Sequence, residues 1–394
     1  MSGEPDRDRA RPRGPWPRSP RERAEPAFPA GFARGHRNRA ALAVLASLPS
    51  LTPRRLVALA ARVPTAGAAL TAVRRGGQSS DDDRARAAEL DGEAVLRGAA
   101  DAGARLVGVG DGEYPASLLD LFDPPAGIFV RGADLRSAAA RVAVVGARNP
   151  TPDGEDASAG LASALAGAGA CVVSGAARGI DAAAHRGALA VSGATIAVLG
   201  CGIDVAYPRQ NASLIERIAE RGTVLSEYPP GTRAEPFRFP ARNRIVAGLS
   251  RAVVIVEGAS GSGSMITADH ALDLGRDVFA VPGPVTSELA TVPLALIRDG
   301  ATMIRGAGDL LEDLGMMPEA GSSPGPPGSG AAISMLAADE AAVLGAVSGS
   351  ASLERIASGA GLPVSRTIAA LVGLEVRGLV RARGGRYEPR PRPG

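Results

Sequence analysis

The chain has 394 residues, of which 45% are hydrophobic and 22% charged, with 44 basic and 41 acidic residues. These values are typical of a globular protein of two or three domains. Two cysteines are too few for a disulfide framework, and the three histidines show no metal-ligand spacing. We therefore expect no metal site and no cofactor.

The basic residues are unevenly distributed along the chain. All of them are Arg, which we attribute first to the codon bias of GC-rich DNA. Residues 1–40 carry ten Arg against five acidic residues, and residues 375–394 carry six against two. The central residues 135–315 carry 16 Arg against 18 acidic residues. A nucleic-acid site in the central region must therefore be a local cluster of Arg.

The first segment, residues 1–39, is rich in Arg and Pro and lacks an apolar core, which predicts a disordered tail and no secretory signal. The longest uncharged stretch, 157–177, consists mostly of Ala, Gly and Ser, so we reject a membrane span. We expect a cytoplasmic protein that does not contact membranes.

Residues 40–77 predict a small helical module of the SAM or helix-hairpin-helix kind. A first helix is expected at 40–47, and a second runs to residue 62 from Pro53, with Thr52 as its N-cap. The acidic segment 78–86 is expected to be a loop. Short strands are predicted at 106–109 and 127–130.

The pattern of residues 105–315 predicts a Rossmann-like α/β domain. Short runs that are apolar on both faces alternate with helical stretches, as expected for a parallel sheet covered on both sides. The runs are 142–145, 170–174, 195–199, 224–226, 252–257 and 278–281.

Two further segments complete the chain. Residues 316–332 are almost entirely Gly, Pro, Ser and Ala, which predicts a flexible linker. Residues 333–390 predict a winged-helix domain, with helices at 339–347, 352–358 and 365–377 and strands at 379–382 and 386–388.

The first motif follows the run 142–145. Gly146 and Arg148 stand at the expected strand end, and Gly154 begins the next helix. A glycine there lets backbone N–H groups approach a phosphate, and an arginine adds a bidentate donor. The spacing differs from G-x-G-x-x-G and disfavours a dinucleotide. An ordinary tight turn is the alternative interpretation.

The second motif follows the run 170–174. Ser174, Gly175, Arg178 and Gly179 would line a crevice at the carboxyl ends of the strands. Asp181 and His185 permit an acid/base pair, but an Asp in the first turn is a normal helix cap and a lone His is more often a packing residue. Cys201, after the third strand, lacks a basic neighbour and is expected to be inert.

Residues 207–244 combine aromatic and Arg residues. Twelve aromatic residues occur in the chain, and four of them stand here with Arg209, Arg233, Arg238, Arg242 and Arg244. Aromatic faces stack on bases and guanidinium groups bind phosphates, so the stretch predicts single-strand binding. Phe239, Arg242, Asn243 and Arg244 are the candidate contacts. The alternative is that the aromatics are core residues and the Arg are solvated.

A Gly/Ser loop after Glu257 is a further candidate anion site. Ser262, Gly263, Ser264 and Thr267 offer backbone N–H and hydroxyl donors at a helix start. The chain has no Lys for a Walker A loop, so ATP hydrolysis is disfavoured.

Together these motifs resemble the DNA-processing protein A family (DprA, also called Smf), strongly over residues 105–315 and more weakly in the flanking regions. The resemblance rests on the segments 144–148, 174–185, 207–208, 226–229 and 239–244, on Glu257, and on 262–267. It implies a homodimeric, non-catalytic protein that binds single-stranded DNA, protects incoming DNA in natural transformation and helps to load the RecA recombinase.

The resemblance also implies roles for single residues. It assigns phosphate binding to Arg148, a basic ligand contact to Arg178, and pocket positions to Arg242 and Arg244. Thr291, Val292 and Pro293 depart from the family pattern, which leaves the contribution of their loop open.

Two other functions remain as alternatives. A nucleotide phosphoribohydrolase on a related Rossmann-like fold would use Glu257, but the expected Pro-Gly-Gly-x-Gly-Thr loop is absent from the sequence. A regulator that reads duplex DNA would use the helix at 365–377, which has only Arg366 and Arg377 as basic residues. Partner binding is an equally good interpretation of that terminal domain.

Overall fold

The computed structural model describes residues 27–76, 79–137, 140–317, 338–347, 349, 351–376, 379–383 and 386–389. The chain divides into two compact units, Met1–Met316 and Met317–Gly394. The expected tail up to residue 26 and most of the expected linker lie outside the described residues.

Five short helices begin the first unit. They are α1 (His36–Ala46), α2 (Pro53–Ala60), α3 (Ala66–Arg74), α4 (Asp81–Glu89) and α5 (Gly92–Asp101). The Thr52 hydroxyl caps α2, as the sequence predicts, by accepting the N–H of Arg55. The predicted loop at 78–86 is wrong, because the Ser80 hydroxyl accepts the N–H of Asp83 at 3.1 Å and starts α4 there.

The predicted end of the tail at residue 39 is also wrong. The rings of Phe28 and Phe32 lie 5.2 Å apart, and Phe32 and Ala33 are fully buried. Two aromatic side chains give this segment enough apolar surface to join the core that the helices share with the sheet. The ordered chain therefore includes residues before α1.

The described part of the first unit contains a nine-stranded sheet of order β1-β2-β6-β5-β4-β3-β7-β8-β9. Strand β2 pairs antiparallel with β1 and β6, and the other pairs are parallel. This confirms the predicted α/β class with a mostly parallel sheet. The strands are β1 (Ala104–Gly108), β2 (Gly127–Gly132), β3 (Ala140–Val145), β4 (Ala170–Ser174), β5 (Thr195–Leu199), β6 (Thr223–Ser226), β7 (Ala252–Ile255), β8 (Asp277–Ala280) and β9 (Thr302–Met303).

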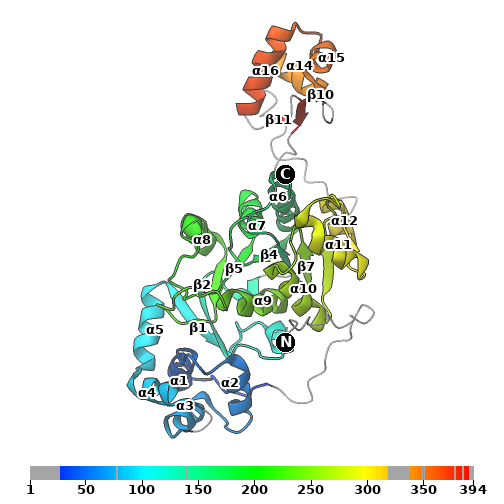
Figure 1. Ribbon diagram of the computed structural model, residues 1–394. Helices are drawn as coiled ribbons and strands as arrows, with labels where there is room; N and C mark the ends of the chain where they lie inside the picture. Colours follow the sequence, from blue (N-terminus) through cyan, green and yellow to red (C-terminus); the bar gives the residue numbers. More distant parts are fainter. Residues whose placement is uncertain are drawn as a thin grey trace, which may run out of the picture. The chain divides into compact units, whose positions relative to one another are not determined.

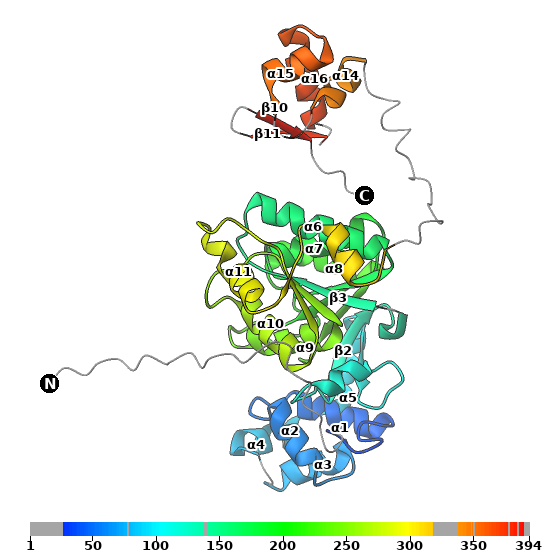
Figure 2. The same ribbon diagram turned by 90° about the vertical axis from the view of Figure 1, so that its right-hand side faces the viewer.

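Helices cover both faces of this sheet (Figures 1 and 2). Alternate residues of β3 point to opposite sides: Val142 and Val144 join a core with α6, whereas Ala143 and Val145 join a core with α9. The helices are α6 (Pro152–Gly167), α7 (Ile180–Ala190), α8 (Ala212–Arg221), α9 (Arg238–Leu249), α10 (Gly263–Asp273), α11 (Thr291–Arg298) and α12 (Ala307–Asp313), with 3-10 turns η1 (Ala116–Asp120), η2 (Leu135–Ser137), η3 (Arg209–Asn211) and η4 (Glu288–Ala290).

The second unit has its own small core, which includes Ile356, Leu371 and Leu374. Its described strands form a three-stranded sheet of order β10-β12-β11, one strand more than the sequence predicts. The elements are α14 (Ala338–Ala346), β10 (Ala351–Ser352), α15 (Leu353–Ala360), α16 (Val364–Val376), β11 (Val380–Arg383) and β12 (Arg386–Pro389). The winged-helix assignment of this unit stays a prediction.

Candidate nucleic-acid interface

The candidate residues gather at the edge of the sheet where the parallel strands have their carboxyl ends. Strand β3 lies between β4 and β7, so the chain order reverses at β3. Crevices at such a reversal are the usual ligand sites of open α/β sheets. Gly146 and Arg148 follow β3, and Gly175 to Gly179 follow β4.

Arg148 forms the exposed cationic part of this edge. Its guanidinium carbon lies 5.3 Å from the centroid of the Phe239 ring, and that ring lies 5.2 Å from the ring of Tyr207. Tyr207 is 44% exposed and Phe239 is half-buried. The cluster therefore combines a cation with partly exposed aromatic faces, as a stacking site for unpaired bases requires.

Arg178 is exposed on a loop that the protein holds firmly in place. The buried carboxylate of Asp181 accepts the N–H of Gly175 at 3.1 Å and that of Ala177 at 3.4 Å. The Asn211 side-chain amide donates to two carbonyls of the same loop, at 3.0 and 3.1 Å. Gly179 takes a φ of 73°, which favours glycine, and α7 begins at the next residue.

Arg242 lies beneath this loop. Only 4% of the residue is exposed, and its guanidinium donates to the carbonyls of Val198 and, at 2.6 Å, Gly175. A side chain at Gly175 would overlap this guanidinium, so the close approach requires glycine there. The expected direct phosphate contact of Arg242 does not fit its burial. We propose that Arg242 positions the loop that carries Arg178.

The next two residues of α9 bridge other elements. Arg244 is also buried, and its guanidinium binds both carboxylate oxygens of Glu227 at 2.8 and 2.9 Å and the carboxylate of Asp123 at 3.2 Å. Asn243 donates to the carbonyl of Gly263 at 2.9 Å. Arg244 is already paired with two carboxylates, which does not fit the expected direct contact with a ligand. We propose that Arg244 supports the site indirectly.

Most of the candidate hydroxyl groups are buried. Ser174 is fully buried and donates to the carbonyl of Val144 at 2.7 Å. Ser264 and Thr267 are buried as well, and the Ser262 and Ser264 hydroxyls lie 2.6 Å apart. Of the four candidates at this loop, Ser262 is half-buried and Gly263 is exposed, so these two keep contact with solvent.

The N-terminus of α6 is occupied by a side chain of the protein. Glu257 accepts the N–H of Thr151 at 2.9 Å and the Thr151 hydroxyl at 2.6 Å. The Thr151 hydroxyl in turn accepts the N–H of Gly154 at 3.0 Å. Gly146 packs against the backbone of Glu257. This carboxylate fills the place that the sequence assigns to a phosphate after β3, so that part of the motif is structural.

His185 and Asp181 have separate partners. His185 is fully buried, its Nδ1 lies 2.7 Å from the Thr195 hydroxyl, and burial lowers its pKa to about 3.

Burial raises the pKa of the Cys201 thiol to about 11, and this thiol donates to the carbonyl of Val205. These placements favour packing roles. Among the described residues, no group of three or more His, Cys, Asp or Glu side chains could hold a metal ion.

The sequence assigns no role to three supporting residues: Asn211, Glu227 and Asp123. Their partners are 17 to 121 positions away in the sequence, so no local pattern links them to the site. The segment 291–293, which departs from the family pattern, is helical. It begins α11 and is docked by the N–H of Val292, which donates to the carbonyl of Gly258 at 2.9 Å.

Comparison with known proteins identifies the family. Residues 105–315 match the family model of the DNA recombination-mediator protein A. The chain belongs to this family. A DprA protein of Mycobacterium tuberculosis is 45% identical over 248 residues, which are 62% of this chain and 63% of that protein. The match thus spans just under two thirds of that relative's length.

Two further DprA proteins support the assignment. The DNA processing protein DprA of Bacillus subtilis is 39% identical over 221 residues, or 56% of this chain and 74% of that protein. The X-ray structure of DprA from Streptococcus pneumoniae is similar with a TM-score of 0.59 and 31% identity, over 71% of this chain and 98% of that one. Among the described residues, no single helix is long and apolar enough to cross a membrane, although α15 and α16 pass that test as a bent pair.

Proposed function

We propose that the chain is a non-catalytic protein that binds single-stranded DNA at the carboxyl edge of its sheet. The observation that carries this proposal is the cluster of Arg148, Phe239 and Tyr207, in which an exposed guanidinium covers one of two adjacent aromatic rings. Unpaired bases expose the faces that such rings stack on, and the neighbouring Arg178 adds a second exposed cation for a phosphate.

The biological role that we propose follows the family. Its name describes a mediator of DNA recombination, and the relatives are named as DNA processing proteins. We propose that the chain protects incoming DNA in natural transformation, helps to load the RecA recombinase, acts as a homodimer and works in the cytoplasm. Single-stranded DNA is the substrate that connects these roles.

We also propose that the second unit is a winged-helix domain that binds a partner protein. Val364, Ile368 and Val372 recur every four residues along α16 and are 43–55% exposed. Arg366 on the same helix is paired with Asp339. An apolar face suits a protein partner better than the phosphates of a DNA groove.

A salt titration tests the DNA-binding proposal. The full chain is mixed with a fluorescein-labelled oligothymidine, and its affinity is measured by anisotropy at several salt concentrations. We expect saturable binding that weakens linearly on a log–log plot, because bound arginines release counterions from the phosphates. Absence of binding even at low salt would reject the proposal.

A further inference from the structure

A second cluster of aromatic and Arg residues meets the first one at the start of α9. The guanidinium of Arg238 lies 5.1 Å from the ring centroid of Tyr228 and 5.3 Å from that of Phe237. Phe237 is the N-cap residue of α9, and Arg238 and Phe239 are the first two residues of that helix. The start of α9 therefore carries two aromatic rings, each with a guanidinium beside it.

Arg238 is held in place by several contacts. Its side chain is only 17% exposed, it forms an ion pair with Glu235 at 3.1 Å, and it donates to the carbonyl of Arg233 at 2.5 Å. The neighbouring acidic charge of Glu235 is thus already paired. Arg238 is therefore a fixed support that contacts the rings of both Tyr228 and Phe237.

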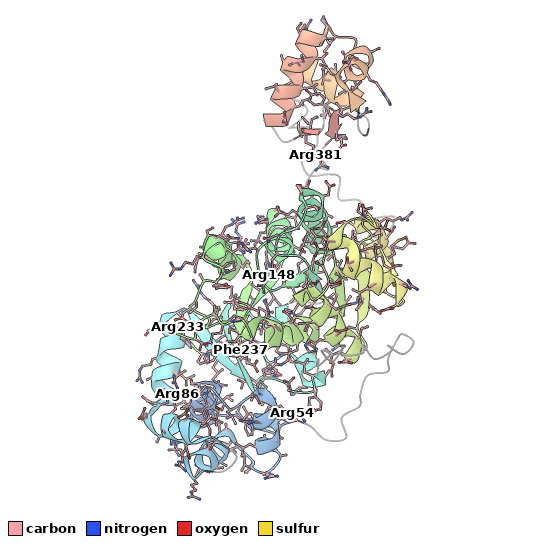
Figure 3. All side chains as sticks on the ribbon, in the orientation of Figure 1. Arg54, Arg86, Arg148, Arg233, Phe237 and Arg381 are labelled. Carbon is pink, nitrogen blue, oxygen red and sulfur yellow. The ribbon has the colours of Figure 1, made fainter. Side chains whose placement is uncertain are left out.

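Phe237, unlike Arg238, is mostly exposed to solvent. It is 65% exposed, although the transfer of such a ring from water into a core is favourable. Arg233, five residues before Arg238, is exposed as well. Figure 3 labels Arg148 and Phe237 near the middle of the first unit and Arg233 toward its left side. An open ring supported by a cation, with an exposed arginine nearby in the chain, meets the requirements of a base and its phosphate.

We infer that Phe237, supported by Arg238 and Tyr228, is a second base-stacking platform for the DNA strand held at Phe239 and Arg148. This inference rests on the proposed function and extends its site along the strand. Arg233 is the phosphate partner of the second platform. The ligand is again single-stranded DNA, because a duplex hides the faces of its bases.

The chain provides a matched control for this platform. Phe122 is 66% exposed, and the guanidinium of Arg54 lies 5.4 Å from its ring centroid. It therefore has the exposure and the cation–π partner of Phe237 but stands in the segment between η1 and β2. Both rings are exposed, so their replacement leaves the core intact.

Stacking itself is measured with tryptophan at each position. The natural Trp16, the only tryptophan of the chain, is first replaced by Phe. In this background, oligothymidine of about 16 nucleotides is expected to quench the fluorescence of Phe237→Trp and to leave that of Phe122→Trp unchanged. Anisotropy of a labelled oligonucleotide reports binding in the same samples.

Affinity gives the second measurement. We expect Phe237→Ala and Phe237→Leu to bind this oligonucleotide at least about fivefold more weakly, and Phe237→Trp and Phe122→Ala to stay within about twofold of the parent. Normal binding by Phe237→Ala, or binding by Phe237→Trp without quenching, would overturn the second platform and leave the proposed function intact. Failure of the parent protein to bind would overturn both.

Discussion

The carboxylate of Glu257 caps the N-terminus of α6 through Thr151, whose N–H and hydroxyl lie 2.9 and 2.6 Å from its two oxygens. Glu257 is the strand-end carboxylate that a nucleotide phosphoribohydrolase would need. Both of its oxygens serve the backbone and side chain of one residue instead. The geometry therefore opposes the enzyme alternative at the position where the sequence leaves it open.

This cap leads to a prediction about stability and activity. We expect Glu257→Gln to lower the free energy of unfolding by about 1 kcal/mol, because the amide replaces one acceptor and removes the charge at the helix start. Urea unfolding measures this loss. We expect neither the wild-type protein nor the variant to release bases from nucleoside monophosphates. Base release by the wild type that disappears in Glu257→Gln would make the enzyme the leading interpretation.

Arg148→Ala is predicted to weaken single-strand binding about tenfold, since it removes an exposed guanidinium and its contact with Phe239. The slope of log affinity against log salt concentration should fall by about 0.7, the value for one phosphate contact on a single strand. Arg86→Ala is the control, because Arg86 is exposed on α4, outside the candidate site (Figure 3). Equal slopes for both variants would contradict a phosphate contact at Arg148.

Arg242→Ala is predicted to act through stability. Its removal leaves the carbonyls of Gly175 and Val198 without their buried donor, at a cost of about 2–4 kcal/mol in unfolding free energy. The loop that carries Arg178 should then shift and DNA affinity should fall. Chemical denaturation and anisotropy separate the two effects. A variant of normal stability that loses one phosphate contact from its salt slope would instead show that Arg242 touches DNA.

The bounds of several strands were predictable because local sequence decides them. Strands β4 and β5 begin and end where the apolar runs 170–174 and 195–199 do. The start of α4 also had a local signal, Ser80 followed by three aspartates, but the polar composition of the segment concealed it. Buried Phe28 and Phe32 were missed because the core that they join includes residues far along the chain, such as Leu70 and Phe129.

The chemistry of the site was predictable only in part. The sequence identified Arg148 and Phe239 as candidates, and the structure places them together. It did not reveal that Arg242 and Arg244 are buried, because their partners Gly175, Glu227 and Asp123 are distant in the sequence. Exposed and buried arginines look alike in a sequence, and the fold alone separates a ligand contact from a structural support.

A protein ending at residue 316 is predicted to fold and to retain the single-strand affinity of the full chain within about twofold. The first unit contains the complete sheet and all the candidate contacts, and the second has a separate core. Circular dichroism and anisotropy check the two parts of this prediction. Loss of most of the affinity would place the main DNA site in the second unit.

The central claim is that the carboxyl edge of the sheet holds a flexible strand with unpaired bases. The most direct measurement is a competition in which unlabelled single-stranded and duplex oligonucleotides of the same sequence displace a labelled single strand at one salt concentration. We predict that the single strand competes at least about tenfold better, because only unpaired bases reach the ring faces of Phe239 and Tyr207. Equal competition by the duplex would contradict the claim.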